Sequence, residues 1–122
     1  MPRYVDGFVI PIKKKNLSAY TKMAKLGCKV WMEHGALDYY ECIGDVLDLP
    51  WSMPFTKQYN LKKDETLIFA FIVYKSKAHS NKVNKAVMSD PRMQMDEKKM
   101  PFSMERFTAG KFNVLVQAKR VA

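Results

Sequence analysis

Two carboxylates stand where they could act on a ligand. Asp6 lies near the start of an expected strand, and Glu41 alternates with apolar neighbours in another. A carboxylate in such a position is costly to bury without a partner. Asp6 and Glu41 are therefore each expected either to form a salt bridge or to act as a general base with a raised pKa.

Two arginines could bind an anion. Arg92 follows a proline, and Arg106 stands at the start of the last expected strand. A guanidinium fork matches a carboxylate on its own chain or on a ligand. The simpler interpretation is a structural salt bridge, with Asp90, Asp96 or Glu41 as the expected partner of Arg92, and anion binding is the alternative.

Histidine and cysteine give no pattern typical of a metal site. The two histidines lack HxxxH or HExxH spacing, so zinc is not expected. His34 is expected to lie at the C-terminal end of a helix, where the dipole favours a cation, and His79 is expected to be solvated. Cys28 and Cys42 are expected to be buried thiols. No cofactor is predicted, because no glycine-rich phosphate loop appears and haem would depend on a lone histidine.

A methionine-rich run links the second expected helix to the last strand. The simplest interpretation is that its thioethers fill irregular gaps. The alternatives are the wall of an apolar pocket and a copper(I) site, although no histidine or cysteine is near enough in sequence to favour copper. The methionines concerned are Met88, Met93, Met95, Met100 and Met104.

Length and composition indicate one globular domain over residues 1–122. Hydrophobic residues make up 48% of the chain and the net charge is +9. The lysines are scattered rather than gathered with aromatic residues, which favours solubility over a nucleic-acid groove. The N-terminus lacks the features of a signal peptide and no apolar run is long enough to span a membrane, so a cytoplasmic protein is expected.

The hydrophobic periods predict an alternation of strands and helices around one long loop. Asn16 is expected to cap the first helix, Gly35 to end it, and Ser76 to cap the second. Gly110 is expected to form a bulge or a close approach in the last strand. The expected elements are a strand at 4–12, a helix from Leu17, a strand at 36–43, a loop at 44–63, a strand at 65–74, a helix at 76–89 and a strand from 106 or 107 to about 117.

This order predicts an α+β fold of the ferredoxin-like βαββαβ type, with a four-stranded antiparallel sheet and two helices on one face. The strand at 65–74 is apolar on both faces, and the first strand offers Phe8 on one face and Val5 and Val9 on the other. The face without helices is therefore expected to be buried against a second copy of the chain, giving a homodimer.

Five short motifs resemble the YbaA-like family of uncharacterised proteins, domain of unknown function 1428. They are YVDGF at 4–8, GAL at 35–37, DET at 64–66, DPRM at 90–93 and MPF at 100–102. The motifs occur in order over essentially the whole chain. The resemblance implies membership of the dimeric α/β-barrel superfamily, which includes small monooxygenases, haem-degrading enzymes and isomerase-like proteins. The fold does not choose among these activities.

The chain departs from the family pattern where acids would be expected. The loop after Gly44 reads VLDLPWSMP, Ser80 and Asn81 replace a charged pair, and Ser103 follows MPF. An acid that acted in relatives at these positions could not act here.

The main functional hypothesis is a homodimer that binds a small apolar or aromatic molecule between sheet and helices, with Asp6, Glu41, Arg92 or Arg106 as the polar contact. The loop at 44–63 is expected to close this cavity. Cofactor-free monooxygenase- or isomerase-like chemistry with a carboxylate base is a further step, suggested by the resemblance. The alternatives are a non-catalytic module that meets an anionic partner such as RNA through its basic surface, and a purely structural dimer. The expected lining residues are Trp31, Tyr39, Phe69, Phe71 and Tyr74.

Overall fold

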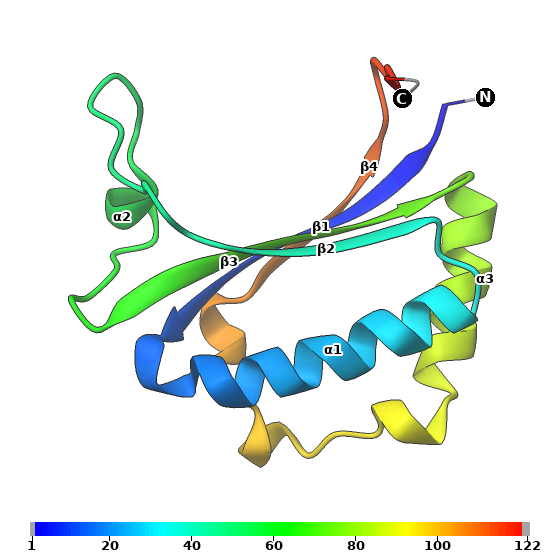
Figure 1. Ribbon diagram of the computed structural model, residues 1–122, viewed down its shortest axis with the longest axis horizontal. Helices are drawn as coiled ribbons and strands as arrows, with labels where there is room; N and C mark the ends of the chain where they lie inside the picture. The colour runs from blue at the N-terminus through cyan, green and yellow to red at the C-terminus, as the bar shows by residue number, and fades with distance from the viewer. Residues whose placement is uncertain (1, 121–122) are drawn as a thin grey trace.

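The computed structural model describes residues 2–120. Its four strands form one antiparallel sheet in the order β2-β3-β1-β4, with the long helices on one face (Figure 1). This confirms the predicted ferredoxin-like arrangement. The elements are β1 (Tyr4–Lys13), α1 (Leu17–Glu33), β2 (Asp38–Ile43), α2 (Phe55–Gln58), β3 (Glu65–Tyr74), α3 (Lys77–Met88) and β4 (Thr108–Asn113), with 3-10 turns at Lys14–Asn16, Pro91–Met93, Glu97–Lys99 and Met104–Arg106.

Strand register decides which residues face the helices. β1 and β3 pair from Tyr4 opposite Tyr74 to Lys13 opposite Glu65 without interruption. Because side chains alternate along a strand, the even-numbered residues of both strands point to the same face. That face carries the buried core, including Ile10 and Ile72, and it is the face that α1 and α3 cover.

The same alternation corrects the predicted positions of two aromatic residues. Phe69 and Phe71 are odd-numbered residues of β3, so both lie on the face opposite the helices. Phe69 is 51% exposed, and Phe71 stacks against Tyr40 with ring centroids 5.0 Å apart. The expectation that they line a cavity under the helices is wrong.

The helix boundaries follow the local sequence. Gly35 adopts φ +113°, a left-handed conformation that suits glycine, and so ends α1 as predicted. Ser76 caps α3 by accepting a hydrogen bond from the backbone N–H of His79 at 3.1 Å. Asn16 occupies the predicted N-cap position of α1, but its side chain makes no capping hydrogen bond and its amide instead donates to the carbonyl of Pro101.

Residues 44–63 lie on the open face of the sheet, away from α1 and α3 (Figure 1). Leu47 and Phe55 of this excursion line a hollow there with Val9 and Phe69 of the sheet. The excursion contains the short helix α2, which was not predicted because the sequence of this segment has no hydrophobic period. It therefore does not close the space between sheet and helices, contrary to expectation.

The last strand is shorter than predicted. β4 ends at Asn113, the partner of Tyr4, which is the first residue of β1, and one further backbone hydrogen bond runs from the N–H of Val114 to the carbonyl of Arg3 at 3.1 Å. Its register opposite β1 is continuous, so Gly110 forms no bulge. Gly110 is instead a point of close approach, since a methyl group there would lie 3.0 Å from the ring of Phe112. None of the described helices is long and apolar enough to cross a membrane.

Candidate ligand-binding cavity

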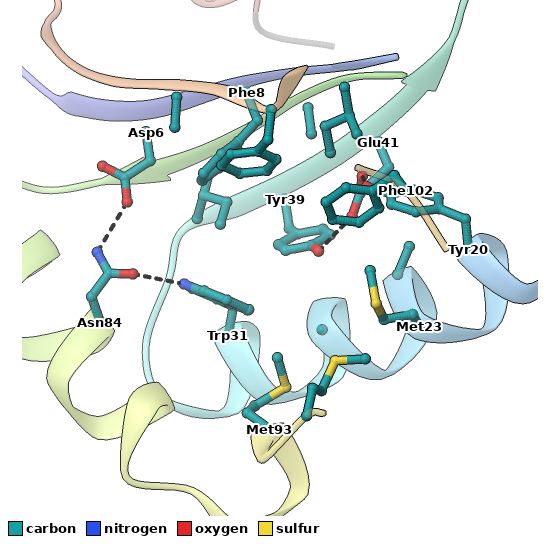
Figure 2. Close-up of a pocket in the computed structure, with 18 of the residues that line it drawn as sticks. Asp6, Phe8, Tyr20, Met23, Trp31, Tyr39, Glu41, Asn84, Met93 and Phe102 are labelled. Carbon is teal, nitrogen blue, oxygen red and sulfur yellow. Dashed lines mark hydrogen bonds between the residues drawn. The ribbon is translucent and has the colours of Figure 1, made fainter. Parts of the chain in front are cut away.

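A cavity of about 780 Å³ lies between the sheet and the helical layer. The strands supply its ceiling, α1 and α3 supply its sides, and the 89–107 connection supplies part of its floor (Figure 2). Its lining is overwhelmingly apolar. Of the predicted lining residues, Trp31 and Tyr39 contact the cavity, whereas Tyr74 is fully buried beside it. The strand and helix lining includes Phe8, Ile10, Tyr20, Met23, Ala24, Gly27, Ala70 and Ile72.

The methionine-rich connection contributes directly to the cavity. All five methionines named in the sequence analysis, from Met88 to Met104, line it. They form a pocket wall rather than only filling gaps beneath a loop. Unbranched thioether side chains adapt to varied apolar shapes, which suits a wall that contacts a ligand. Within residues 2–120 no group of three or more His, Cys, Asp and Glu side chains is placed to hold a metal ion.

The first polar cluster centres on Asp6, which is only 4% exposed. Its carboxylate accepts from Lys111 Nζ, Tyr74 Oη and Asn84 Nδ2, each at 2.9 Å. Asn84 Oδ1 in turn accepts from Trp31 Nε1 at 3.1 Å (Figure 2). Burial and then the hydrogen bond to Asp6 raise the pKa of Tyr74 well above its ordinary value, so its phenol remains a donor. Asp6 thus forms the salt bridge that was one of its two predicted roles, with Lys111 as partner.

The second polar cluster centres on Glu41. Tyr20 Oη donates to Glu41 Oε1 at 2.5 Å, and Tyr39 Oη donates to Oε2 at 2.7 Å. Burial, followed by the bond to Glu41, raises the pKa of both phenols far above the ordinary value. Among residues 2–120, no ion pair involves Glu41. Glu41 therefore has neither the predicted salt bridge nor Arg92 as a neighbour.

Arg92 lies outside the cavity and joins the end of α1 to the turn after α3. Its Nη2 is 2.8 Å from Asp90 Oδ2 and 2.7 Å from Glu33 Oε2. Asp90 also contacts His34 Nε2 at 2.9 Å. Arg92 and, second, His34 hold the pKa of Asp90 well below its usual range. The predicted pairing of Arg92 with Asp90 is confirmed, and the role of this cluster is structural.

Arg106 also lies outside the cavity. It forms an ion pair with Glu65 at the start of β3, and its Nη2 donates to the carbonyl of Tyr59 at 2.8 Å. The guanidinium hydrogen bond holds the pKa of Glu65 below its ordinary value. Arg106 therefore fastens the end of the 44–63 excursion to the sheet and does not contact the cavity.

Sequence reasoning missed three polar residues of the cavity. Lys111 is the direct strand partner of Asp6, so the register of β1 against β4 could have identified it. Asn84 lies four residues after buried Ser80 on the inner face of α3, between Val83 and Val87. A polar side chain on this buried face could have marked it as a residue of the cavity. Tyr20 lies at a buried position of α1, and the sequence alone does not show that its hydroxyl reaches Glu41.

The sheet order and one-sided helical layer define a ferredoxin-like α+β protein. Two solved structures, each described as a dimeric ferredoxin-like protein from an uncultured marine organism, share this arrangement. Their TM-scores are 0.56 and 0.57, and the matches cover 97% and 98% of this chain and the whole of theirs. At 15% and 14% identity these similarities show the fold alone.

The sequence comparisons identify the family. Residues 3–104 match the family described as "Protein of unknown function (DUF1428)". The uncharacterized protein YbaA of Escherichia coli K12 is 32% identical over 114 residues, covering 93% of this chain and 97% of that protein, and YbaA of Shigella flexneri matches equally. The chain belongs to the DUF1428 family, which confirms the resemblance seen in its motifs.

Proposed function

We propose that this protein binds a small, largely apolar or aromatic molecule in the cavity between sheet and helices. The observation that carries the proposal is a space of about 780 Å³ walled by aromatic, aliphatic and methionine side chains, with polar groups at two places. Pockets for small molecules are commonly of this size, with an apolar lining and a few fixed polar contacts.

Binding is better supported than proton abstraction. Asp6 accepts hydrogen bonds from three donors, one of which is the ammonium group of Lys111, and Glu41 accepts hydrogen bonds from two phenols. Both carboxylates are thus already engaged by donors of the protein itself, which hold them in fixed positions. The proposal is therefore a binding protein in which these polar groups orient the ligand.

A cavity-filling substitution tests the proposal. Ala24 lines the cavity, so Ala24→Phe should occupy part of it and weaken the binding of the uncharged apolar dye Nile red by at least about tenfold. Ala78→Phe is the matched control, because Ala78 is exposed on α3. The titration follows tryptophan fluorescence in a Trp51→Phe background, which leaves Trp31 in the cavity wall as the reporter.

Two results would count against the binding proposal. One is Nile red failing to bind the native protein. The other is equal weakening by Ala24→Phe and Ala78→Phe, because the dye would then not occupy the cavity. Thermal melting of both variants establishes that each is folded under the conditions of the titration.

We also propose that the protein is a homodimer through the open face of its sheet. Tyr40, Phe69 and Phe112 are each more than half exposed there, and Phe71 stacks with Tyr40. A contiguous aromatic surface of this kind is typical of an interface. Both solved structures that share the fold are described as dimeric, which supports the same assembly here.

Sedimentation velocity tests the dimer. Phe69→Lys places a charge at the centre of the open face and should shift the protein towards monomer at micromolar concentration. Met32→Lys is the control, since Met32 is an exposed apolar residue of α1 on the other side of the molecule. A monomeric native protein, or a Phe69→Lys variant as dimeric as the native protein, would contradict this interface.

A further inference from the structure

The charges that line the cavity do not balance. The charged residues in its lining are Asp6, Glu41 and Lys111. Lys111 Nζ lies 2.9 Å from Asp6 Oδ1, so these two neutralise each other. Glu41 is left without a cation among residues 2–120, in a chain whose net charge is +9. A strongly basic protein therefore presents one unneutralised carboxylate to an apolar cavity.

Glu41 is held in place and retains capacity to bind. Each of its oxygens accepts one phenol hydrogen bond, from Tyr20 and from Tyr39. A carboxylate has about four lone-pair positions, so a second donor can reach each oxygen. The phenols fix the orientation of the group but carry no charge, because their raised pKa values keep them protonated. The negative charge thus remains for a ligand to neutralise.

The surroundings of Glu41 favour a cation over other donors. Aromatic faces and thioethers attract a positive charge, and Tyr20, Tyr39 and Phe102 lie around this end of the cavity (Figure 2). Lys111 marks the other end, next to Asp6, where it would repel a second cation. In Figure 2 Asp6 and Glu41 lie on opposite sides of Phe8, which separates the two positions.

Lys25 is the lysine of the chain that could compete with a ligand cation for Glu41. It lines a smaller groove with Glu41 and Tyr39, but it is exposed on α1 and forms no ion pair with Glu41 in the described chain. An exposed lysine separated from its carboxylate is screened by water and salt. A ligand cation inside the cavity would be desolvated and would interact with Glu41 more strongly.

We infer that the ligand class is an organic ammonium compound with an apolar or aromatic body, whose positive group binds Glu41. This inference rests on the proposed binding function and narrows it to one chemical class. The apolar body would occupy the methionine and aromatic walls, and the ammonium group would donate to the free lone pairs of Glu41 between Tyr20 and Tyr39.

Three compounds with one skeleton test the inference: 4-phenylbutylamine, 4-phenylbutanol and 4-phenylbutyrate. Each is titrated against the protein by isothermal calorimetry and by displacement of Nile red. The amine should bind at least about tenfold more tightly than the alcohol, and the carboxylate should bind most weakly. In Glu41→Gln the advantage of the amine over the alcohol should disappear.

Asp38→Asn is the matched control, because it removes one negative charge from the same strand at an exposed position on the open face. It should preserve the preference for the amine. Equal binding of amine and alcohol to the native protein overturns the inference, as does an amine preference that survives Glu41→Gln or that is lost in Asp38→Asn. If Nile red binds and the amine does not displace it, the inference fails and the binding proposal stands. If Nile red does not bind, the binding proposal itself fails.

Discussion

Gly27 offers a sharp test of how the Glu41 cluster is built. It lies on the buried face of α1, and a methyl group added there would be 2.9 Å from the hydroxyl oxygen of Tyr39. Alanine is favoured over glycine in a helix interior by about 1 kcal/mol. Displacing the phenol from Glu41 removes a hydrogen bond to a charged group, which contributes about 1.5 to 3 kcal/mol. Gly27→Ala should therefore lower the free energy of unfolding by roughly 0.5 to 2 kcal/mol.

The companion substitution is Tyr39→Phe, which removes the oxygen that the new methyl group would meet. In that background Gly27→Ala should raise the free energy of unfolding by about 1 kcal/mol, because only the helix preference remains. Urea unfolding of the four proteins, followed by far-ultraviolet circular dichroism, gives the coupling between the two sites. If Gly27→Ala stabilises the native sequence as much as it stabilises Tyr39→Phe, the close contact between α1 and Tyr39 does not constrain the protein.

Three further predictions test the core and the charged clusters. Val83→Ala should lower the free energy of unfolding by about 2 to 3 kcal/mol in urea titrations, because Val83 is 1% exposed and loses two methyl groups. Lys111→Met should cost about 1 to 3 kcal/mol by leaving the buried Asp6 charge without its cation, and adding Asp6→Asn should recover part of this loss. Asp90→Asn should flatten the acid limb of the stability profile. In the native protein Arg92 lowers the pKa of folded Asp90, so this stabilisation is present above about pH 4 and is lost as the pH falls further. The Asp90→Asn variant should not show this loss.

Most of the fold could be predicted because local signals agreed with one another. The nearly apolar ten-residue strand β3 and the Ser76 cap of α3 matched the structure at their predicted first residues. The errors came where a distant partner decides the outcome. Asn16 has the side chain of a helix cap, but the carbonyl of Pro101, 85 residues away, takes its hydrogen bond. β4 stops where its partner strand ends, which its own sequence does not encode.

The candidate site was harder to predict because it depends on which face each residue occupies. Trp31 and Tyr39 were placed in the cavity correctly. Phe69 and Phe71 lie within the apolar stretch 67–73 of β3, which has no polar residue to mark either face. Alternation along β3 becomes informative only when a paired strand fixes it, as Glu41 opposite Ala70 does. Arg92 was expected to form a structural salt bridge or to bind an anion, and the acids with which it pairs lie outside the cavity.

The two faces of the sheet separate the two proposed activities. Ala70 and Ile72 of β3 border the cavity, while the odd-numbered Phe69 and Phe71 lie on the open face proposed for dimerisation. The backbone between them is shared, so a shift of β3 in one direction would alter both surfaces. The ladder to β1 resists such a shift because it is uninterrupted over ten residue pairs. The more adaptable side of the cavity is therefore the methionine wall of the 89–107 connection, because no residue of this connection belongs to a strand. Ligands of different shape should be accommodated at this wall while the open face of the sheet stays unchanged.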